Sequence, residues 1–188
     1  MSTWAIRKTY SLDMRPRYEA LISARRVYVT PEEAHVVTTR DLPMPPPLVW
    51  EWLNDPHKRA QYAHEKVEFV PVVRPFGRTG VGARTHCVHG KRTAMVETVL
   101  DWRPFDYFTV EQAMGPFGER ATFQLTPIPG GGTRLQLMER GRLTSLGFLD
   151  RALITFMLTK LVPTAKLLET LDKCIAADLA RQRAPTIE

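Results

Sequence analysis

The segment Arg84-Thr-His-Cys-Val-His89 contains the residue types in this chain that are best suited to metal binding. Histidine nitrogen and cysteine sulfur are good zinc ligands. The segment is, however, typical of a β-strand, in which successive side chains point to opposite faces. His86 and His89 are an odd number of positions apart, so we predict that they do not share a metal, and we expect no metal and no cofactor. His86 then lies either on the surface or in a cavity wall, and we retain it as a candidate for the wall.

Carboxylates on the neighbouring strands are the other candidates for chemistry. Strand alternation directs Glu97 and Asp101 toward water if Leu100 and Trp102 face inward. The alternative is that Glu97 or Tyr107 points into a cavity and works as an acid or base together with His86. Both orientations are kept as hypotheses. No catalytic residue is assigned, and whether the chain is an enzyme is left open.

One long C-terminal helix is predicted over residues 146–179, where apolar residues recur at intervals of three and four. Pro163 lies inside this pattern and would remove one helical hydrogen bond. We therefore expect a kink at Pro163 rather than two separate helices.

The first half of this helix is apolar on more than one face. Phe156 and Met157 are predicted to face the sheet and to form part of a cavity wall. Ile154 and Leu158 would then lie on the flanking face. A second subunit, the N-terminal extension or a membrane surface would cover them there.

Short runs of alternating residues precede the helix, separated by turns rich in Gly and Pro. Consecutive strands with short joints indicate an antiparallel meander, because parallel strands need long crossovers. Such a sheet is expected to have an apolar inner face and a wet outer face. Strands are predicted at 35–42, 67–73, 82–89, 92–102, 106–113, 120–127 and 133–143, with short helices at 47–53 and 57–64. The fold class is α+β, a curved antiparallel sheet of about seven strands wrapped on the long helix.

The formal charge of +6 comes from scattered Lys and Arg residues without a recognised nucleic-acid motif, so no nucleic-acid binding is expected. Cys87 and Cys174 are the two cysteines, which exclude a disulfide framework and favour a reducing compartment. The most apolar run, at 153–158, is far shorter than the roughly 20 residues of a membrane span. We expect a cytoplasmic protein with at most peripheral membrane contact.

Four motifs with structural roles occur in this order. They are Pro46-Pro-Leu-Val-Trp-Glu-Trp-Leu-Asn-Asp-Pro56, Gly80-Val-Gly-Ala-Arg84, Val99-Leu-Asp-Trp-Arg-Pro104 followed by Tyr107, and Pro129-Gly-Gly-Gly-Thr-Arg-Leu135. With them, the chain resembles the START-like superfamily, the helix-grip fold of polyketide cyclase/dehydrase-like proteins and lipid-transfer domains. The resemblance covers about residues 35–180. Residues 1–34 are predicted to be an N-terminal extension, and residues 35–184 the helix-grip domain.

The resemblance implies a hydrophobic cavity between sheet and helix that holds lipids, sterols, aromatic polyketides or hormones. It carries over no catalytic residue, because none is shared across the superfamily. The predicted ligand-binding residues are Trp50, His86, Glu97, Phe108, Phe123, Phe156 and Met157.

Three functions follow as hypotheses. The first is binding or transport of a hydrophobic small molecule: a lipid, an isoprenoid or an aromatic polyketide. The alternatives are a polyketide cyclase/dehydrase-type enzyme and a protein-interaction module or homodimer. A wholly apolar cavity would favour the carrier, and two acidic or basic groups converging inside it would favour the enzyme. A filled core would favour the interaction module.

Overall fold

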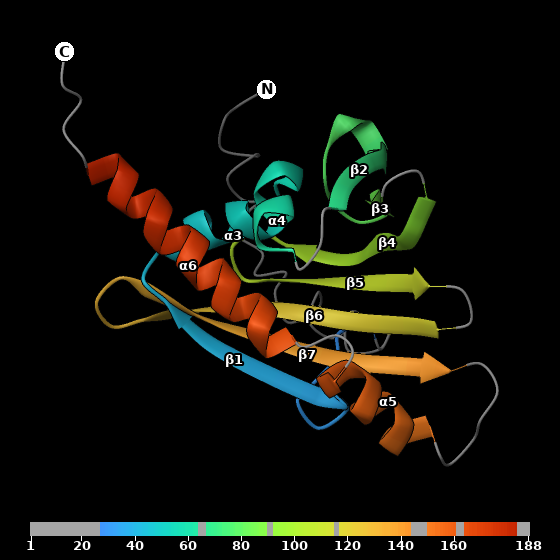
Figure 1. The fold of residues 1–188 in the computed structure, drawn as a ribbon. Coiled ribbons are helices and arrows are strands. Elements are labelled where there is room, and N and C mark those ends of the chain that lie inside the picture. Colours follow the sequence, from blue (N-terminus) through green and yellow to red (C-terminus); the bar gives the residue numbers. More distant parts are fainter. Residues whose placement is uncertain are drawn as a thin grey trace, which may run out of the picture.

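Seven antiparallel strands form one curved sheet in the order β1-β7-β6-β5-β4-β3-β2 (Figure 1). The arrangement comes from a computed structural model that describes residues 27–63, 67–89, 92–114, 117–143, 150–160 and 164–183. The strands are β1 (Val36–Leu42), β2 (Val67–Val73), β3 (Arg84–His89), β4 (Arg92–Arg103), β5 (Tyr107–Met114), β6 (Phe117–Ile128) and β7 (Gly132–Leu143). β2 to β7 form the predicted meander, and β1 pairs with β7 at the far edge. The predicted α+β helix-grip architecture is confirmed.

Two short helices, α3 (Pro46–Asn54) and α4 (Pro56–Tyr62), follow β1. Each has proline in its first turn, where the missing N–H costs no helical hydrogen bond. Asp55 separates the helices and caps α4, because its side chain accepts hydrogen bonds from the backbone N–H groups of His57 and Lys58. The buried side chains of α3 join the main core: Val49, Trp50, Trp52 and Leu53. Together the two helices cover one end of the concave face of the sheet (Figure 1).

The C-terminal helical region consists of α5 (Asp150–Lys160) and α6 (Thr164–Arg183). α6 is the long helix that lies diagonally across the sheet in Figure 1. Its fully buried residues recur by three and four and join the main core: Leu168, Leu171 and Ile175. The predicted kink at Pro163, and residues 146–149 of the predicted helix, lie outside the described residues.

Helix α5 packs on the sheet through Ile154 and Leu158, the residues that were predicted to lie beside the contact face and not on it. Ile154 and Leu158 are each 1% exposed and pack against Phe117, whereas Phe156 is 56% exposed. The predicted orientation of this helix is therefore wrong. The reason is Gly141 on β7, where an added Cβ atom would lie only 2.6 Å from Cγ2 of Ile154. Because glycine permits this close approach, Ile154 is the residue that docks.

The segment before β1 lies on the convex face of the sheet, which was predicted to be wet. Val29 is buried there, and its backbone N–H donates to Oγ1 of Thr122 at 2.9 Å. The Tyr28 hydroxyl donates to Oε1 of Gln124 at 2.7 Å. Met138 on β7 is fully buried in the same cluster. The expectation of a wet outer face is thus wrong for this part of the sheet, because these residues of the predicted extension cover it.

Candidate functional site

A cavity of about 290 Å³ lies between the concave face of the sheet, α4 and the first turns of α6. Its wall is mostly apolar and aromatic, with a few polar groups. The aliphatic and thioether side chains in the wall are Leu53, Ala63, Val67, Met95, Met114, Leu167 and Leu168. This is the position of the cavity that the family resemblance implied.

Two stacked phenylalanine rings form a flat part of the wall. Phe108 on β5 and Phe123 on β6 are direct cross-strand partners. Their ring centroids are 4.6 Å apart, and the planes differ by 7°. Trp50 of α3 meets Phe108 edge-on at 5.3 Å and supports it from behind. A planar apolar ligand could therefore lie against a rigid aromatic surface.

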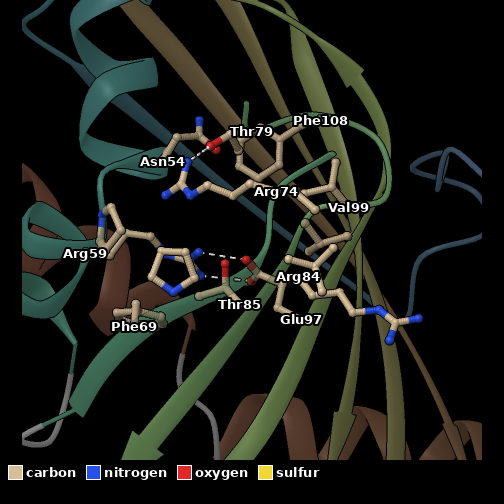
Figure 2. A pocket seen from close by; sticks show the side chains of 15 residues that line it. Asn54, Arg59, Phe69, Arg74, Thr79, Arg84, Thr85, Glu97, Val99 and Phe108 are labelled. Carbon is tan, nitrogen blue, oxygen red and sulfur yellow. Dashed lines mark hydrogen bonds and ion pairs between the residues drawn. The ribbon is translucent and has the colours of Figure 1, made fainter. Parts of the chain in front are cut away.

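An ion pair between Arg59 of α4 and Glu97 of β4 crosses the interior, as Figure 2 shows. Nη1 and Nη2 of Arg59 donate to the two carboxylate oxygens of Glu97 at 2.7 and 2.9 Å. Nε2 of Gln112 donates to the same carboxylate at 3.1 Å, and the guanidinium lies 4.2 Å from the centroid of the Phe69 ring. Burial alone would raise the pKa of Glu97, but the charge and hydrogen bonds of Arg59 hold that pKa below its ordinary value.

A second, much smaller cavity of about 20 Å³ adjoins the first (Figure 2). It has room for about one water molecule. Arg59, Phe69 and Phe108 line both cavities, and Glu97 lines the smaller one. The ion pair and these two rings therefore separate the small cavity from the large one.

A β-bulge in β4 explains why Glu97 faces inward. The register of β4 against β5 leaves Leu100 as an extra residue between Val99 and Asp101. A bulge restarts the alternation of side chains. Glu97 and Trp102 therefore both face the core although they are an odd number of positions apart. The prediction that Glu97 faces water depended on unbroken alternation and is wrong; the alternative, an inward orientation, is the one observed.

A pair of buried carboxyl groups occupies the other end of the larger cavity. Glu119 on β6 lines the cavity and is 5% exposed, and Glu139 on β7 is 3% exposed. Oε1 of Glu139 accepts a hydrogen bond from Oγ1 of Thr164 at 2.8 Å, and the Glu119 carboxyl group is near enough to act on the pKa of Glu139.

The pKa values of this pair shift in the direction that burial dictates. Burial raises the pKa of Glu139 to about 9, and the nearby charge of Glu119 adds to the rise. Burial also raises the pKa of Glu119. Both carboxyl groups therefore hold their protons more strongly than exposed glutamates do.

The polar side chains form a row across an otherwise apolar face. Glu97 pairs with Gln112 across β4 and β5, and Gln112 pairs with Glu119 across β5 and β6. Gly141 on β7 is opposite Glu119, and Glu139 lies two residues before it on the same face. The row therefore extends from the Arg59 ion pair to the carboxyl pair.

Three more polar side chains line the large cavity. Cys87 and His89 project from the same face of β3, with Sγ and Nε2 3.4 Å apart. Tyr62 at the end of α4 is buried, and burial raises the pKa of its hydroxyl to about 12.

The predicted ligand-binding residues fall into two groups. Phe108 and Phe123 line the large cavity, and Glu97 lines the small one. The remaining four line neither cavity: Trp50, His86, Phe156 and Met157. Ligand binding by the first group stays a prediction.

Each of the four has a physical reason for its position. Trp50 is buried behind Phe108. His86 lies on the face of β3 opposite Cys87 and His89. Phe156 and Met157 follow the orientation of α5, in which Ile154 and Leu158 face the sheet and Met157 only flanks their cluster.

Arg59, Glu119 and Glu139 were not among the predicted residues. Glu119 was missed because the predicted strand began at residue 120, whereas β6 begins at Phe117. Glu139 could have been found, because it continues the period-two series of Leu135 and Leu137. No local pattern distinguishes Arg59 from the other basic residues of the chain.

Among the described residues, no three His, Cys, Asp or Glu side chains converge closely enough to hold a metal ion. No helix within the described ranges is both long and apolar enough to cross a membrane.

Solved structures share this fold. Protein MLL2253 from Mesorhizobium loti is 21% identical, with a TM-score of 0.58 over 76% of this chain and 96% of that chain. TTHA0849 from Thermus thermophilus is 23% identical, with a TM-score of 0.57 over 76% of this chain and 97% of that chain. DynU16, a protein in the dynemicin biosynthetic locus, is 18% identical, with a TM-score of 0.53 over 76% of this chain and 47% of that chain. At these identities, the likeness shows the fold alone.

No curated protein sequence matches the chain significantly. The sequence model of one family, described as polyketide cyclase/dehydrase and lipid transport, matches residues 33–165. The curved sheet, the long C-terminal helix and the cavity between them agree with that assignment. The chain therefore belongs to the polyketide cyclase/dehydrase and lipid transport family, within the START-like superfamily.

Proposed function

We propose that the large cavity binds a hydrophobic small molecule of the lipid, isoprenoid or aromatic polyketide type. The observation that carries the proposal is the cavity of about 290 Å³, walled mainly by aliphatic and aromatic side chains. Family membership supports it, and so does the position of the cavity between the sheet and the long helix α6. Apolar concave sites with a few placed polar groups are the usual form of small-molecule sites.

The size and shape of the cavity favour a compact ligand. Small-molecule sites typically span roughly 300–1,000 Å³, so this cavity is near the lower end. The stacked Phe108 and Phe123 rings offer a flat contact surface. A planar, ring-containing ligand fits this surface better than a long flexible chain does.

The polar groups in the wall would orient such a ligand. Glu119 and His89 lie in the wall of the large cavity, and Arg59 reaches it from the side of α4. Because Arg59 is already paired with Glu97, we expect Glu119, the carboxyl group in this wall, to bond to the ligand. A ligand with one polar end directed at Glu119 would satisfy both the apolar and the polar parts of the wall.

Binding can be tested with the neutral aromatic dye N-phenyl-1-naphthylamine, whose fluorescence increases in apolar surroundings. The wild-type protein should bind it saturably, in about one copy per chain. Ala63 lines the cavity at the end of α4, so Ala63→Phe should fill the space and weaken binding at least about tenfold. The matched control is Ala113→Phe on the convex face, which should bind as the wild type does. Equal binding by both variants would show that the dye occupies some other surface, and the proposal would fail.

A second candidate function, a polyketide cyclase/dehydrase-type enzyme, is favoured by one specific observation. Two carboxyl groups converge at the cavity, and one of them faces the space directly. Convergent acidic groups were the feature expected to separate an enzyme from a carrier. Buried carboxyl groups with shifted pKa values beside a ligand site are an arrangement that can support general acid–base catalysis.

A further inference from the structure

We propose that the loop between β2 and β3 docks this protein on an anionic lipid surface. Phe76 enters the lipid, and the arginines beside it bind the negatively charged headgroups. We call residues 72–81 the docking tip. None of these residues lines the large cavity, so the proposal does not rest on ligand binding there.

The exposure of Phe76 is the first argument. The residue lies in the short 3₁₀ turn η1 (Pro75–Gly77), and it is 100% exposed, so its ring buries no surface against the described part of the chain. Its φ angle of 53° is a value that glycine and asparagine adopt more readily than phenylalanine does. Neither packing among the described residues nor backbone preference therefore explains an aromatic ring at this position. A contact with an apolar partner outside the chain does explain it.

Other exposed apolar side chains lie close to Phe76. Val72 and Val81, at the two ends of the docking tip, are 46% and 57% exposed. The exposure of Val72 follows from a bulge in β2, because the register against β3 leaves it as an extra residue between Pro71 and Val73. Val81 and Phe76 line one open hollow of about 400 Å³. Exposed apolar groups gathered in one place mark a contact surface, whereas scattered ones do not.

The charge of the surrounding sequence is the second argument. No Asp or Glu occurs between Phe69 and Val96, whereas the same stretch contains five basic residues: Arg74, Arg78, Arg84, Lys91 and Arg92. The three arginines at 74, 78 and 84 are exposed, and Figure 2 shows the guanidinium of Arg84 pointing away from the interior. Glu97, the next acidic residue along the chain, is buried and paired with Arg59. Positive charge beside exposed apolar side chains is the combination that binds anionic lipid surfaces.

Two other occupants fit the docking tip less well. A second copy of the chain would bring like charges together, and Pro71 interrupts the row of N–H groups with which the edge strand β2 could pair. A nucleic-acid duplex would meet the arginines, but its phosphate backbone gives the exposed valines no apolar contact. A lipid bilayer offers both anionic headgroups and an apolar layer beneath them.

Sedimentation with lipid vesicles tests the proposal. The vesicles consist of phosphatidylcholine alone or of equal parts of phosphatidylcholine and phosphatidylglycerol, which is anionic. The wild-type protein should bind the mixed vesicles and bind phosphatidylcholine alone far more weakly. Salt at about 1 M, where the Debye length is about 3 Å, should release most of the bound protein. If the wild type does not bind the mixed vesicles at low salt, the proposal is overturned.

Substitutions in the docking tip separate the roles of charge and ring. Arg78→Gln should weaken binding to the mixed vesicles about fivefold, the effect of one charge near an anionic surface. Phe76→Asn/Arg78→Gln should weaken it more than about tenfold, because the apolar contact is lost as well. Asparagine is the replacement because it tolerates the positive φ angle. If Phe76→Asn alone leaves binding unchanged, the ring does not enter the lipid and the proposal fails.

Phe156→Gln/Arg140→Gln is the matched control. It removes one phenylalanine and one positive charge at exposed positions on α5 and β7, away from the docking tip. The control should bind the mixed vesicles as the wild type does. Equal losses in the control and in Phe76→Asn/Arg78→Gln would show that net charge and general hydrophobicity drive the binding, and would overturn the assignment to the tip.

Three further measurements complete the test. All substituted side chains are exposed, so the variants should melt near the wild-type temperature, and a loss of vesicle binding at an unchanged melting temperature supports the proposal. Phe76→Trp should bind the mixed vesicles at least as tightly as the wild type does, because tryptophan is favoured at the lipid interface. A DNA duplex that binds through Arg78 while the mixed vesicles do not bind would overturn the proposal.

Discussion

Arg59 and Glu97 form a bidentate ion pair in the interior, with N–O distances of 2.7 and 2.9 Å. Arg59 comes from the short helix α4, and Glu97 comes from β4 at the point where a bulge turns it inward. Both side chains are largely buried, so each charge depends on the other in place of water. The pair thereby fixes α4 against the sheet and forms the partition between the two cavities.

The first prediction concerns the energy of this pair. Arg59→Met or Glu97→Leu alone should lower the free energy of unfolding by about 3–5 kcal/mol, because each leaves one buried charge without its partner. The double variant should cost clearly less than the sum of the two, since no charge remains unpaired. Denaturant unfolding of the four proteins measures this difference.

The exposed pair of Arg120 and Glu111 is the control for that cycle. It lies on the convex face, where solvent screens the charges, and its coupling should be under about 1 kcal/mol. Additive effects for Arg59→Met and Glu97→Leu, as small as those of the control, would mean that the buried pair does not hold α4 in place.

The second prediction concerns the pH dependence of stability. The pKa of Glu139 is about 9 in the folded protein, above the ordinary value of 4.5. A raised folded pKa favours the folded state at low pH, and this contribution is lost as the pH rises from the unfolded to the folded pKa. Thermal stability should therefore fall between about pH 5 and about pH 9. Glu139→Gln cannot ionise, so at about pH 8 it should melt several degrees above the wild type.

Glu111→Gln again provides a matched control, since Glu111 is exposed and the variant should keep the wild-type pH slope. Glu119 titrates in the same direction as Glu139, so Glu139→Gln should remove only part of the slope. If the melting temperature of Glu139→Gln fell with pH as steeply as that of the wild type, Glu139 would not be protonated in the folded protein.

The architecture could be predicted from the sequence because the patterns that define it are local. The alternation of Phe123 and Leu125, and of Leu135 and Leu137, marks strands whose inner residues are observed in the core or in the cavity wall. Proline at the start of α3 and the glycine-rich turn before β7 mark the ends of elements. These signals need no knowledge of the neighbours in space.

The site depends on relationships that no local pattern contains. One extra residue in β4, Leu100, reverses the side on which Glu97 lies, and nothing in the surrounding residues marks it as a bulge. Glu119 and Glu139 come together because β6 and β7 pair in one particular register. Period-two reasoning can place each carboxylate on a face, but only the register shows that the two lie close together.

The third prediction tests the close approach of α5 to the sheet. Gly141→Ala would place a Cβ atom about 2.6 Å from Cγ2 of Ile154, so α5 must shift outward. We expect a loss of about 1–3 kcal/mol in the free energy of unfolding, as for other overpacked cores. Gly80→Ala is the matched control, because its added Cβ atom would meet no heavy atom within 4 Å. Equal stability of the two variants would place α5 further from β7 than the structure does.

The last prediction separates the two faces of α5 by side-chain deletion. Leu158 is 1% exposed and packs with Ile154 and Phe117, whereas Phe156 is 56% exposed. Leu158→Ala should therefore lower the free energy of unfolding by about 2–5 kcal/mol, because it leaves a void that the cluster fills only in part. Phe156→Ala removes the larger side chain but should cost less than about 1 kcal/mol, since most of that ring already contacts solvent. Denaturant unfolding of both variants decides between the faces: a larger loss in Phe156→Ala would show that the ring, and not Leu158, faces the sheet.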